Sequence, residues 1–139
     1  NLNSLIEQAT CQFTRHAVIQ QFIPSIREGD KRVLIINGKP IPKALLRTPK
    51  GGDFRGNLNA DASSKLVDLT ERDYWIVNQL VPALIQRDLT FVGIDISGEY
   101  LTEINVNSPT CVREIQSAFA SPILDPLFDL IEERSQHPG

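Results

Sequence analysis

Apolar and polar positions alternate in two neighbouring blocks of the chain, 91–96 and 101–106. Alternation with a period of two is typical of a β-strand with one buried face, because successive side chains point to opposite sides. In the first block Asp95 projects from the face opposite to the valine and isoleucine side chains, and in the second block Glu103 and Asn105 do the same. The two blocks are therefore predicted to form a β-hairpin with polar side chains on one face.

The connection between the two strands decides whether these polar side chains meet, because directly opposed residues in an antiparallel pair share a face. A two-residue turn at Gly98-Glu99 would set Asp95 opposite Thr102 and turn it away from Glu103. A three-residue or bulged connection through Tyr100 would set Asp95 opposite Glu103. We expect the longer or bulged connection.

Two carboxylates and an amide oxygen form a hard, anionic set of ligands. Such a set suits magnesium or manganese held together with nucleotide phosphates, so Asp95, Glu103 and Asn105 are candidate metal ligands. The alternative is that these are solvated polar positions on a half-exposed sheet.

The remaining pattern predicts an α+β domain, with strands and helices packed around one mainly antiparallel sheet. The expected elements are the end of a helix over 4–14, strands over 17–23 and 31–36, a turn at Asn37-Gly38 into a strand through Leu45 and Leu46, a helix to about residue 88, the hairpin, a short helix through 115, and a helix over 126–134. Pro40 and Pro42 lack ladder donors, so the strand that follows the turn should begin irregularly or at an edge.

Four local signals refine this outline. Thr70 is expected to cap the long helix with Asp73 at its third position, and Pro82 is expected to kink it. Residues 49–64 contain three glycines, two asparagines and little apolar content, and they are predicted to form a long lid loop that is mobile without ligand. The Ser108-Pro109-Thr110 segment precedes the short helix, so either hydroxyl could serve as its N-cap.

Composition restricts the class of protein. A chain of 139 residues with 41% hydrophobic residues is long enough for one globular domain. The net charge of -3 and the pI near 5.3 argue against a general nucleic-acid surface. No segment has the length of a membrane span or the pattern of a signal peptide, which favours the cytoplasm. Cys11 and Cys111 lack metal-ligand spacing and are expected to be reduced, with Cys111 packed in the core.

Three arginines form a second group of candidate residues. Around the Asn37-Gly38 turn, Asp30 and Arg32 are expected to share a face with Arg47, and Arg55 lies in the glycine-rich loop. The planar fork of arginine suits phosphate and carboxylate oxygens. Arg32, Arg47 and Arg55 would thus form a clamp for phosphoryl transfer. The alternative is that they are surface cations paired with nearby carboxylates.

Several whole segments of the chain carry a further signal. They are Gly29-Asp30-Lys31-Arg32, Arg47-Thr48-Pro49, Gly51-Gly52-Asp53-Phe54, Arg-Gly-Asn-Leu at 55–58, Phe91-Val92-Gly93-Ile94, the Asp...Glu-x-Asn pattern of 95–105, and Asn-Ser-Pro-Thr at 107–110. In these segments the chain resembles the C-terminal part of the bacterial-type glutathione synthetases, which are ATP-grasp ligases, and the likeness runs from about residue 17 to 135 without large gaps. The segments at 55–58 and 107–110 are specific to that family, whereas the Asp...Glu-x-Asn pattern occurs across ATP-grasp enzymes.

The resemblance implies a role for each candidate residue. Metal ligands for two divalent ions, magnesium or manganese, that bridge the ATP phosphates would be Asp95, Glu103 and Asn105. Adenine would bind a hinge strand that includes Gln20, Gln21, Phe22 and Ile23, and Asp30 would meet the ribose. The catalytic arginines Arg32, Arg47 and Arg55 would neutralise the transferred phosphoryl group and the substrate carboxylate, with Arg47 also contacting ATP. Peptide substrate would lie along Arg55, Asn57, Ser108 and Thr110.

The implied reaction joins γ-glutamylcysteine to glycine through an acyl phosphate, in a homo-oligomeric full-length enzyme. The 139 residues would be the C-terminal lobe of the ATP-grasp fold, with 49–64 as its active-site lid. The substrate domain and the lysine-bearing lobe would precede Asn1, and the absence of methionine, even at position 1, also indicates a piece of something longer or a processed or engineered product. The isolated chain is therefore expected to be inactive. Alternatives are another ATP-grasp carboxylate-amine ligase or a non-catalytic nucleotide-binding module.

Overall fold

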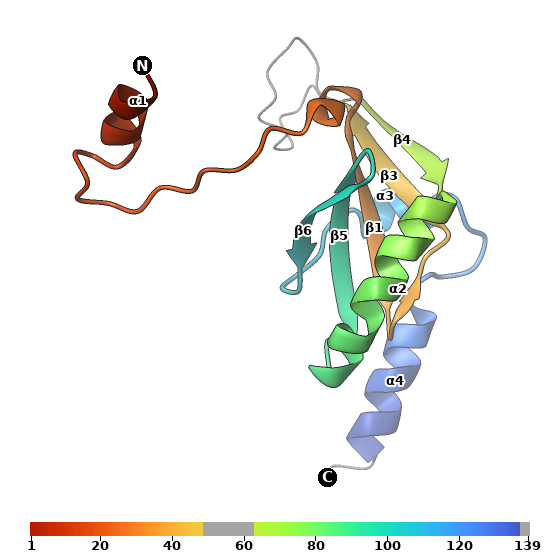
Figure 1. The fold of residues 1–139 in the computed structure, drawn as a ribbon. Coiled ribbons are helices and arrows are strands. Elements are labelled where there is room, and N and C mark those ends of the chain that lie inside the picture. The colour runs from red at the N-terminus through yellow and green to blue at the C-terminus, as the bar shows by residue number, and fades with distance from the viewer. Residues whose placement is uncertain (49–62, 137–139) are drawn as a thin grey trace.

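The structure is a computed structural model of the 139-residue chain that describes residues 1–48 and 63–136. An antiparallel sheet runs through its centre in the order β4-β3-β1-β5-β6, and the short β2 pairs with β1 outside this path (Figure 1). The strands are β1 (Asp30–Ile36), β2 (Lys39–Pro40), β3 (Lys43–Thr48), β4 (Ser63–Asp68), β5 (Phe91–Ser97) and β6 (Tyr100–Asn105). The helices are α1 (Leu2–Ala9), the 3-10 helix η1 (Pro24–Glu28), α2 (Glu71–Gln86), α3 (Val112–Gln116) and α4 (Asp125–Gln136). The predicted α+β class with an antiparallel sheet is confirmed.

Both faces of the sheet are covered, each by its own apolar cluster. On one face α2 packs over alternate residues of β1 and β5, including Val33, Ile35 and Ile94, which are buried. On the other face α3 and the segment after it pack over Leu34. The second face is apolar only where α3 covers it. Towards the start of β1 and the end of β5 the same face carries charged side chains, and the candidate site lies there.

The predicted start of the long helix is confirmed. Thr70 accepts a hydrogen bond from the backbone of Asp73 at 3.2 Å, and the Asp73 carboxylate accepts one from the Thr70 backbone at 2.9 Å. The Asp73 side chain is fully buried and also accepts two hydrogen bonds from Lys31 Nζ, each of 2.5 Å. The first turn of α2 is therefore attached directly to β1. Pro82 lies inside α2, as the sequence indicates.

The turn between β1 and β2 also follows its sequence signal. Asn37 and Gly38 have φ angles of 46° and 76°, as expected for the asparagine-glycine turn that matches strand twist. Pairing with β1 stops after Pro40 and resumes at β3. The irregular start predicted from the two prolines is confirmed, and Asp30 pairs with Arg47 on the expected face.

Three sequence expectations were wrong. Residues 17–23 form no strand and run as an extended connection from α1 to η1 (Figure 1), without a ladder partner in the described part of the chain. The first helix ends at Ala9 because Cys11 and the two residues after it adopt positive φ angles. Strand β4 was missed, since it is a largely exposed edge strand with few apolar residues.

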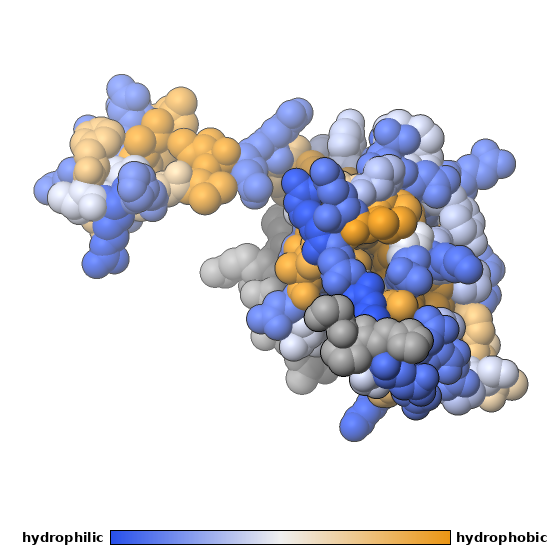
Figure 2. Space-filling model, turned by 90° about the horizontal axis from the view of Figure 1, so that it is seen from below, coloured by the Kyte–Doolittle hydropathy of each residue, from blue (hydrophilic) through white to orange (hydrophobic). Residues whose placement is uncertain are grey.

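Helix α1 has no buried residue; Leu2 and Leu5 within it and Phe13 after it are exposed. Hydrophobic side chains gather on the N-terminal part of the chain at the left of Figure 2. Both cysteines are free, with Cys11 exposed and Cys111 buried, as expected. None of the helices within the described ranges is long and apolar enough to cross a bilayer.

Candidate metal and nucleotide site

A bulge in β6 brings the two predicted carboxylates to one face. The turn itself has only two residues, since Ser97 pairs with Tyr100, but the register shifts between Asp95 and Ile96 so that Asp95 pairs with Glu103. The extra residue is Thr102, whose hydroxyl donates to the Asp95 carbonyl at 3.1 Å. The expected bulged connection is confirmed, although the bulge lies in the strand rather than in the turn.

Asp95 is 5% exposed and is held by two arginines, one on the adjacent strand β1 and one on β3, the next strand beyond β1. Arg32 donates from Nε to Oδ1 at 2.5 Å and from Nη2 to Oδ2 at 2.9 Å. Arg47 approaches Oδ2 with Nη2 at 3.0 Å and also pairs with Asp30. The four side chains form a buried row of alternating charge. Such a row fixes the direction of each carboxylate, because a charge left unpaired at this depth is strongly unfavourable.

The arginines also set the ionisation of Asp95. Burial alone would raise the pKa of its carboxyl, but hydrogen bonds and charge from Arg32 and Arg47 outweigh burial and hold the pKa below its ordinary value. Burial likewise acts to lower the pKa of Arg32, yet its bond to Asp95 leaves that pKa raised. The pKa of Arg47 is raised in the same way, by Asp30 and Asp95 against the effect of burial. All three groups are charged at neutral pH.

Glu103 and Asn105 complete the candidate metal ligands. Glu103 is exposed, and its carboxylate has no hydrogen bond or ion pair within the described residues. Asn105 lies opposite Gly93, on the same face, and its Oδ1 accepts a hydrogen bond from the Asn107 backbone at 3.1 Å. The described residues contain no cluster of three or more His, Cys, Asp or Glu placed to hold a metal. These hard oxygen donors nevertheless fit magnesium or manganese, since Glu103 is available and Asp95 is ionised beside it.

The segment 107–111 lies against the arginine row. Thr110 Oγ1 accepts a hydrogen bond from Arg32 Nη1 at 3.3 Å. A side chain at Gly93 would put its Cβ 2.9 Å from Pro109, so only glycine lets this segment rest on β5. The alternative role of Ser108 or Thr110 as the N-cap of the short helix is not seen: α3 begins after Cys111, which has a φ of 76° and makes no side-chain cap. Thr110 instead joins the charged row.

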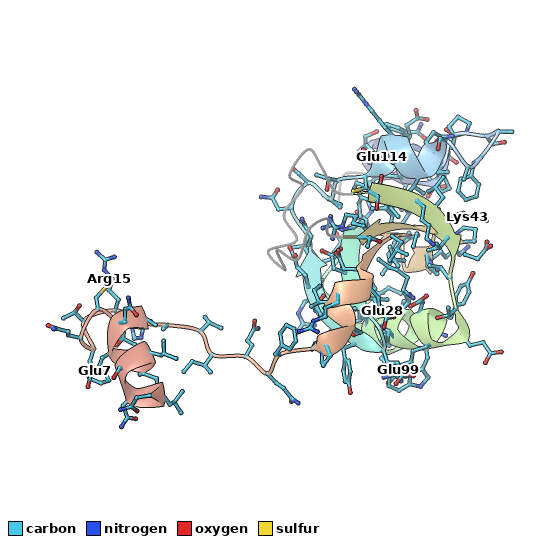
Figure 3. The ribbon with its side chains drawn as sticks, turned by 90° about the horizontal axis from the view of Figure 1, so that it is seen from above. Glu7, Arg15, Glu28, Lys43, Glu99 and Glu114 are labelled. Carbon is cyan, nitrogen blue, oxygen red and sulfur yellow. The ribbon has the colours of Figure 1, made fainter. Side chains whose placement is uncertain are left out.

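A hollow of about 380 Å³ lies between the segment that leads into η1 and the β5–β6 hairpin. Figure 3 looks down on this end of the sheet and labels Glu28 of η1 and Glu99 at the hairpin tip, which lie near each other. The residues that line the hollow are Gln20, Gln21, Phe22, Ile23, Ile26, Ser97 and Thr102. The four residues predicted to hold adenine therefore border one space, whereas Asp30 and Arg47, the other two predicted nucleotide-binding residues, do not line it.

Ser97 and Thr102 were missed in the sequence. Ser97 follows Asp95 by two positions, so strand alternation places it on the same face, and that signal was available. Thr102 faces the site only because of the bulge. Arg55 and Asn57 lie outside the described residues, as does nearly all of the predicted lid.

Comparison with known proteins gives three kinds of match. Residues 1–120 match the family described as "Prokaryotic glutathione synthetase, ATP-grasp domain". Curated relatives named glutathione synthetase include that of Escherichia coli K12, 47% identical over 98% of this chain and 43% of the relative. The Shewanella oneidensis protein is 49% identical over 96% of this chain and 42% of the relative. The chain thus spans about two fifths of the relatives that it matches. The solved structure of the ATP-grasp ligase PsnB with a minimal precursor covers 77% of this chain and 34% of its own, at 21% identity and a TM-score of 0.49.

Proposed function

Because the chain belongs to the prokaryotic glutathione synthetase family through its ATP-grasp domain, we propose that it supplies the metal-binding face of an ATP-dependent ligase that joins γ-glutamylcysteine to glycine. The observation that carries this proposal is the pairing of Asp95 with Glu103 beside the buried arginine row. A solvated sheet face would not require a carboxylate at 5% exposure shared by two guanidinium groups.

In the proposed reaction the cysteinyl carboxylate attacks the γ-phosphorus of ATP, which gives an acyl phosphate and ADP. The glycine amine then attacks the acyl carbon, loses a proton and expels phosphate. Phosphoryl transfer requires charge neutralisation and alignment more than covalent participation of the protein. The side chains at this end of the sheet supply fixed charge of that kind.

The arginines would play different parts in this reaction. Arg32 uses Nε, Nη1 and Nη2 within the protein, on Asp95 and Thr110, so it would act by holding Asp95. Arg47 has a buried Nε that finds no hydrogen-bond partner within residues 1–48 and 63–136. A buried N–H donor without a partner is unfavourable, and an anionic phosphoryl oxygen would satisfy it. Arg47 is therefore the better candidate for direct contact with ATP, and Arg55 would contact the substrate carboxylate.

Asp95, Glu103 and Asn105 would hold two divalent ions, magnesium or manganese. Such ions neutralise phosphate charge when bound. The hollow beside Gln20–Ile23 would receive adenine against apolar side chains. Ribose would lie near Asp30, and the peptide substrate along Asn57, Ser108 and Thr110. Residues 49–64 would close over the acyl phosphate and exclude water. We further propose that the whole enzyme is a cytoplasmic homo-oligomer.

A chimeric enzyme tests the proposal. This chain would replace the matching 43% of the Escherichia coli glutathione synthetase, and glutathione formation would be followed with ATP, magnesium and both substrates. We expect magnesium-dependent turnover in the chimera. Glu103→Gln should lower that turnover by about 100-fold or more, as expected for loss of electrostatic stabilisation.

Glu99→Gln is the matched control, because Glu99 lies on the same hairpin in its exposed turn. It should leave turnover unchanged. A chimera that is folded, as shown by a cooperative unfolding transition, but makes no glutathione would contradict the proposal. A Glu103→Gln chimera that is as active as the unmodified chimera would contradict it as well. The isolated 139-residue chain, assayed in parallel, should make none.

A further inference from the structure

Ser97 is the buried hydroxyl at this end of the sheet that the proposed reaction does not use. Its side chain is fully buried, and its Oγ has no hydrogen-bond partner among the residues that the structure describes. A buried hydroxyl without a partner destabilises a folded protein, because it has lost water and gained nothing in exchange. An alanine at this position would remove that penalty, so the hydroxyl calls for an explanation outside the ligand-free fold.

The surroundings of Ser97 indicate where its partner comes from. Ser97 borders the hollow together with Phe22, Ile23 and Ile26, which are mainly apolar in that wall. The next residue, Gly98, has a φ of 57°, and a Cβ there would lie 2.5 Å from Ser25 Oγ. The end of β5 therefore packs closely against η1. Rotation about the serine Cα–Cβ bond is the motion that turns its hydroxyl between the protein and the hollow.

We propose that Ser97 is a binding residue for the nucleoside part of the nucleotide, donating or accepting a hydrogen bond with the ligand that occupies this hollow. The inference rests on the proposed function, because it takes the ligand of the hollow to be a nucleotide. A hydroxyl both donates and accepts, so it matches either a ring nitrogen or an exocyclic amine. The base would lie against the apolar wall of the hollow, and the hydrogen bond with Ser97 would fix the orientation of the base.

The proposal makes two predictions of opposite sign for Ser97→Ala. The ligand-free chain should become more stable, with a melting temperature raised by a few degrees, because an unpaired buried hydroxyl is removed. Affinity for nucleotide should fall roughly 3- to 10-fold, the value of one hydrogen bond. A hydroxyl with only a structural role would give the reverse result for stability and no change in affinity.

The experiment uses the 139-residue chain in two measurements. Melting is followed by circular dichroism without ligand, and dissociation constants are obtained from amide NMR titrations with magnesium ADP and with adenosine. The matched control is Ser117→Ala. Ser117 is exposed, and its hydroxyl already donates to the Glu114 carbonyl at 2.6 Å. This control should not raise the melting temperature, and it should bind both probes as the unmodified chain does.

Each outcome of the two measurements supports or overturns the proposed role of Ser97. Higher stability together with weaker binding of both ADP and adenosine supports the proposal. Lower stability of Ser97→Ala, or unchanged affinity for both probes, overturns it and leaves the proposed function intact. A loss confined to ADP also overturns it, because the contact would then be to phosphate. If only the chimera with the Escherichia coli enzyme binds the probes, the affinities are compared in the chimera. If neither the unmodified chain nor the chimera binds adenosine or ADP, the hollow is not a nucleotide site, and this inference fails together with the assignment of adenine to the hollow.

Discussion

Arg32 and Asp95 lie directly opposite each other on β1 and β5 and are joined by two hydrogen bonds, of 2.5 and 2.9 Å. Both side chains are 6% exposed. The pair therefore belongs to the interior of the fold as well as to the candidate site, and any change to one partner alters both stability and the direction of the Asp95 carboxylate.

Replacing Arg32 should destabilise the chain strongly. Arg32→Ala leaves a buried carboxylate with only Arg47 beside it, and loss of one partner from a buried pair lowers the free energy of unfolding by about 3 kcal/mol. Urea unfolding followed by circular dichroism measures this change. The matched control is Arg134→Ala, which removes the exposed pair with Asp88 and should leave the unfolding midpoint unchanged. Similar midpoints for the two variants would mean that the Arg32 pair contributes no more than a surface pair.

Stability should depend on the ionisation of Asp95 at low pH. Its folded-state pKa lies below the ordinary value of about 3.9. The stability it contributes is therefore fully present above about pH 4 and is lost as the pH falls through the lower folded-state pKa. The free energy of unfolding is measured in chelator-containing buffer for the unmodified chain and for Asp95→Asn. The difference between the two should be largest near neutral pH and should shrink below about pH 4. A difference that stays constant from neutral pH into the acid range would show that Asp95 is not stabilised as an anion.

The buried contact between Lys31 and Asp73 should matter more than the helix cap that shares it. Thr70→Ala removes one cap bond and should lower the free energy of unfolding by about 1 kcal/mol. Asp73→Asn leaves the largely buried Lys31 ammonium without its anion and should lower it by about 3 kcal/mol. Chemical denaturation of the two variants compares them directly. Equal effects would indicate that Asp73 acts only as part of the capping box.

Two glycines with positive φ should respond differently to alanine. At Gly29 the φ is 109° and a Cβ would collide with the Arg47 carbonyl, whereas at Gly38 the nearest atom is a Val81 methyl at 3.2 Å. Gly38→Ala should lower the free energy of unfolding by about 1 kcal/mol, because alanine is strained in the left-handed backbone conformation. Gly29→Ala should lower the free energy of unfolding by at least twice as much, because the new methyl group must also displace β3 and the Arg47 side chain. Comparable unfolding midpoints would contradict this.

The part of the site that sequence could predict follows from alternation and local signals. Alternation placed Asp95, Glu103 and Asn105 on one face once a bulge was allowed, and a capping box marked the start of α2. The location of the bulge at Thr102 depends on how β6 packs, which local sequence does not report. Residues 17–23 have the apolar content of a strand, but no neighbouring edge pairs with them in the described part of the chain. Strand formation needs such a partner.

The charged row illustrates a second limit. Arginines and carboxylates are common on surfaces, and only the pairing of β1 with both β3 and β5 shows that Asp30, Arg47, Asp95 and Arg32 meet in the interior. The sequence predicted that the arginines share a face. It did not predict that Arg32 would be fully engaged with Asp95 and Thr110, which changes its proposed role from phosphate contact to positioning.

Paramagnetic broadening tests most directly whether Asp95 and Glu103 hold a divalent ion together with a nucleotide. Manganese would be titrated at low concentration into the isotope-labelled chain with ADP, because manganese and magnesium take similar oxygen ligands. The amide signals that broaden first should be those of β5 and β6 around Asp95, Glu103 and Asn105, and Glu103→Gln should abolish this broadening while Glu99→Gln retains it. Broadening centred elsewhere, or unchanged in Glu103→Gln, would contradict the account.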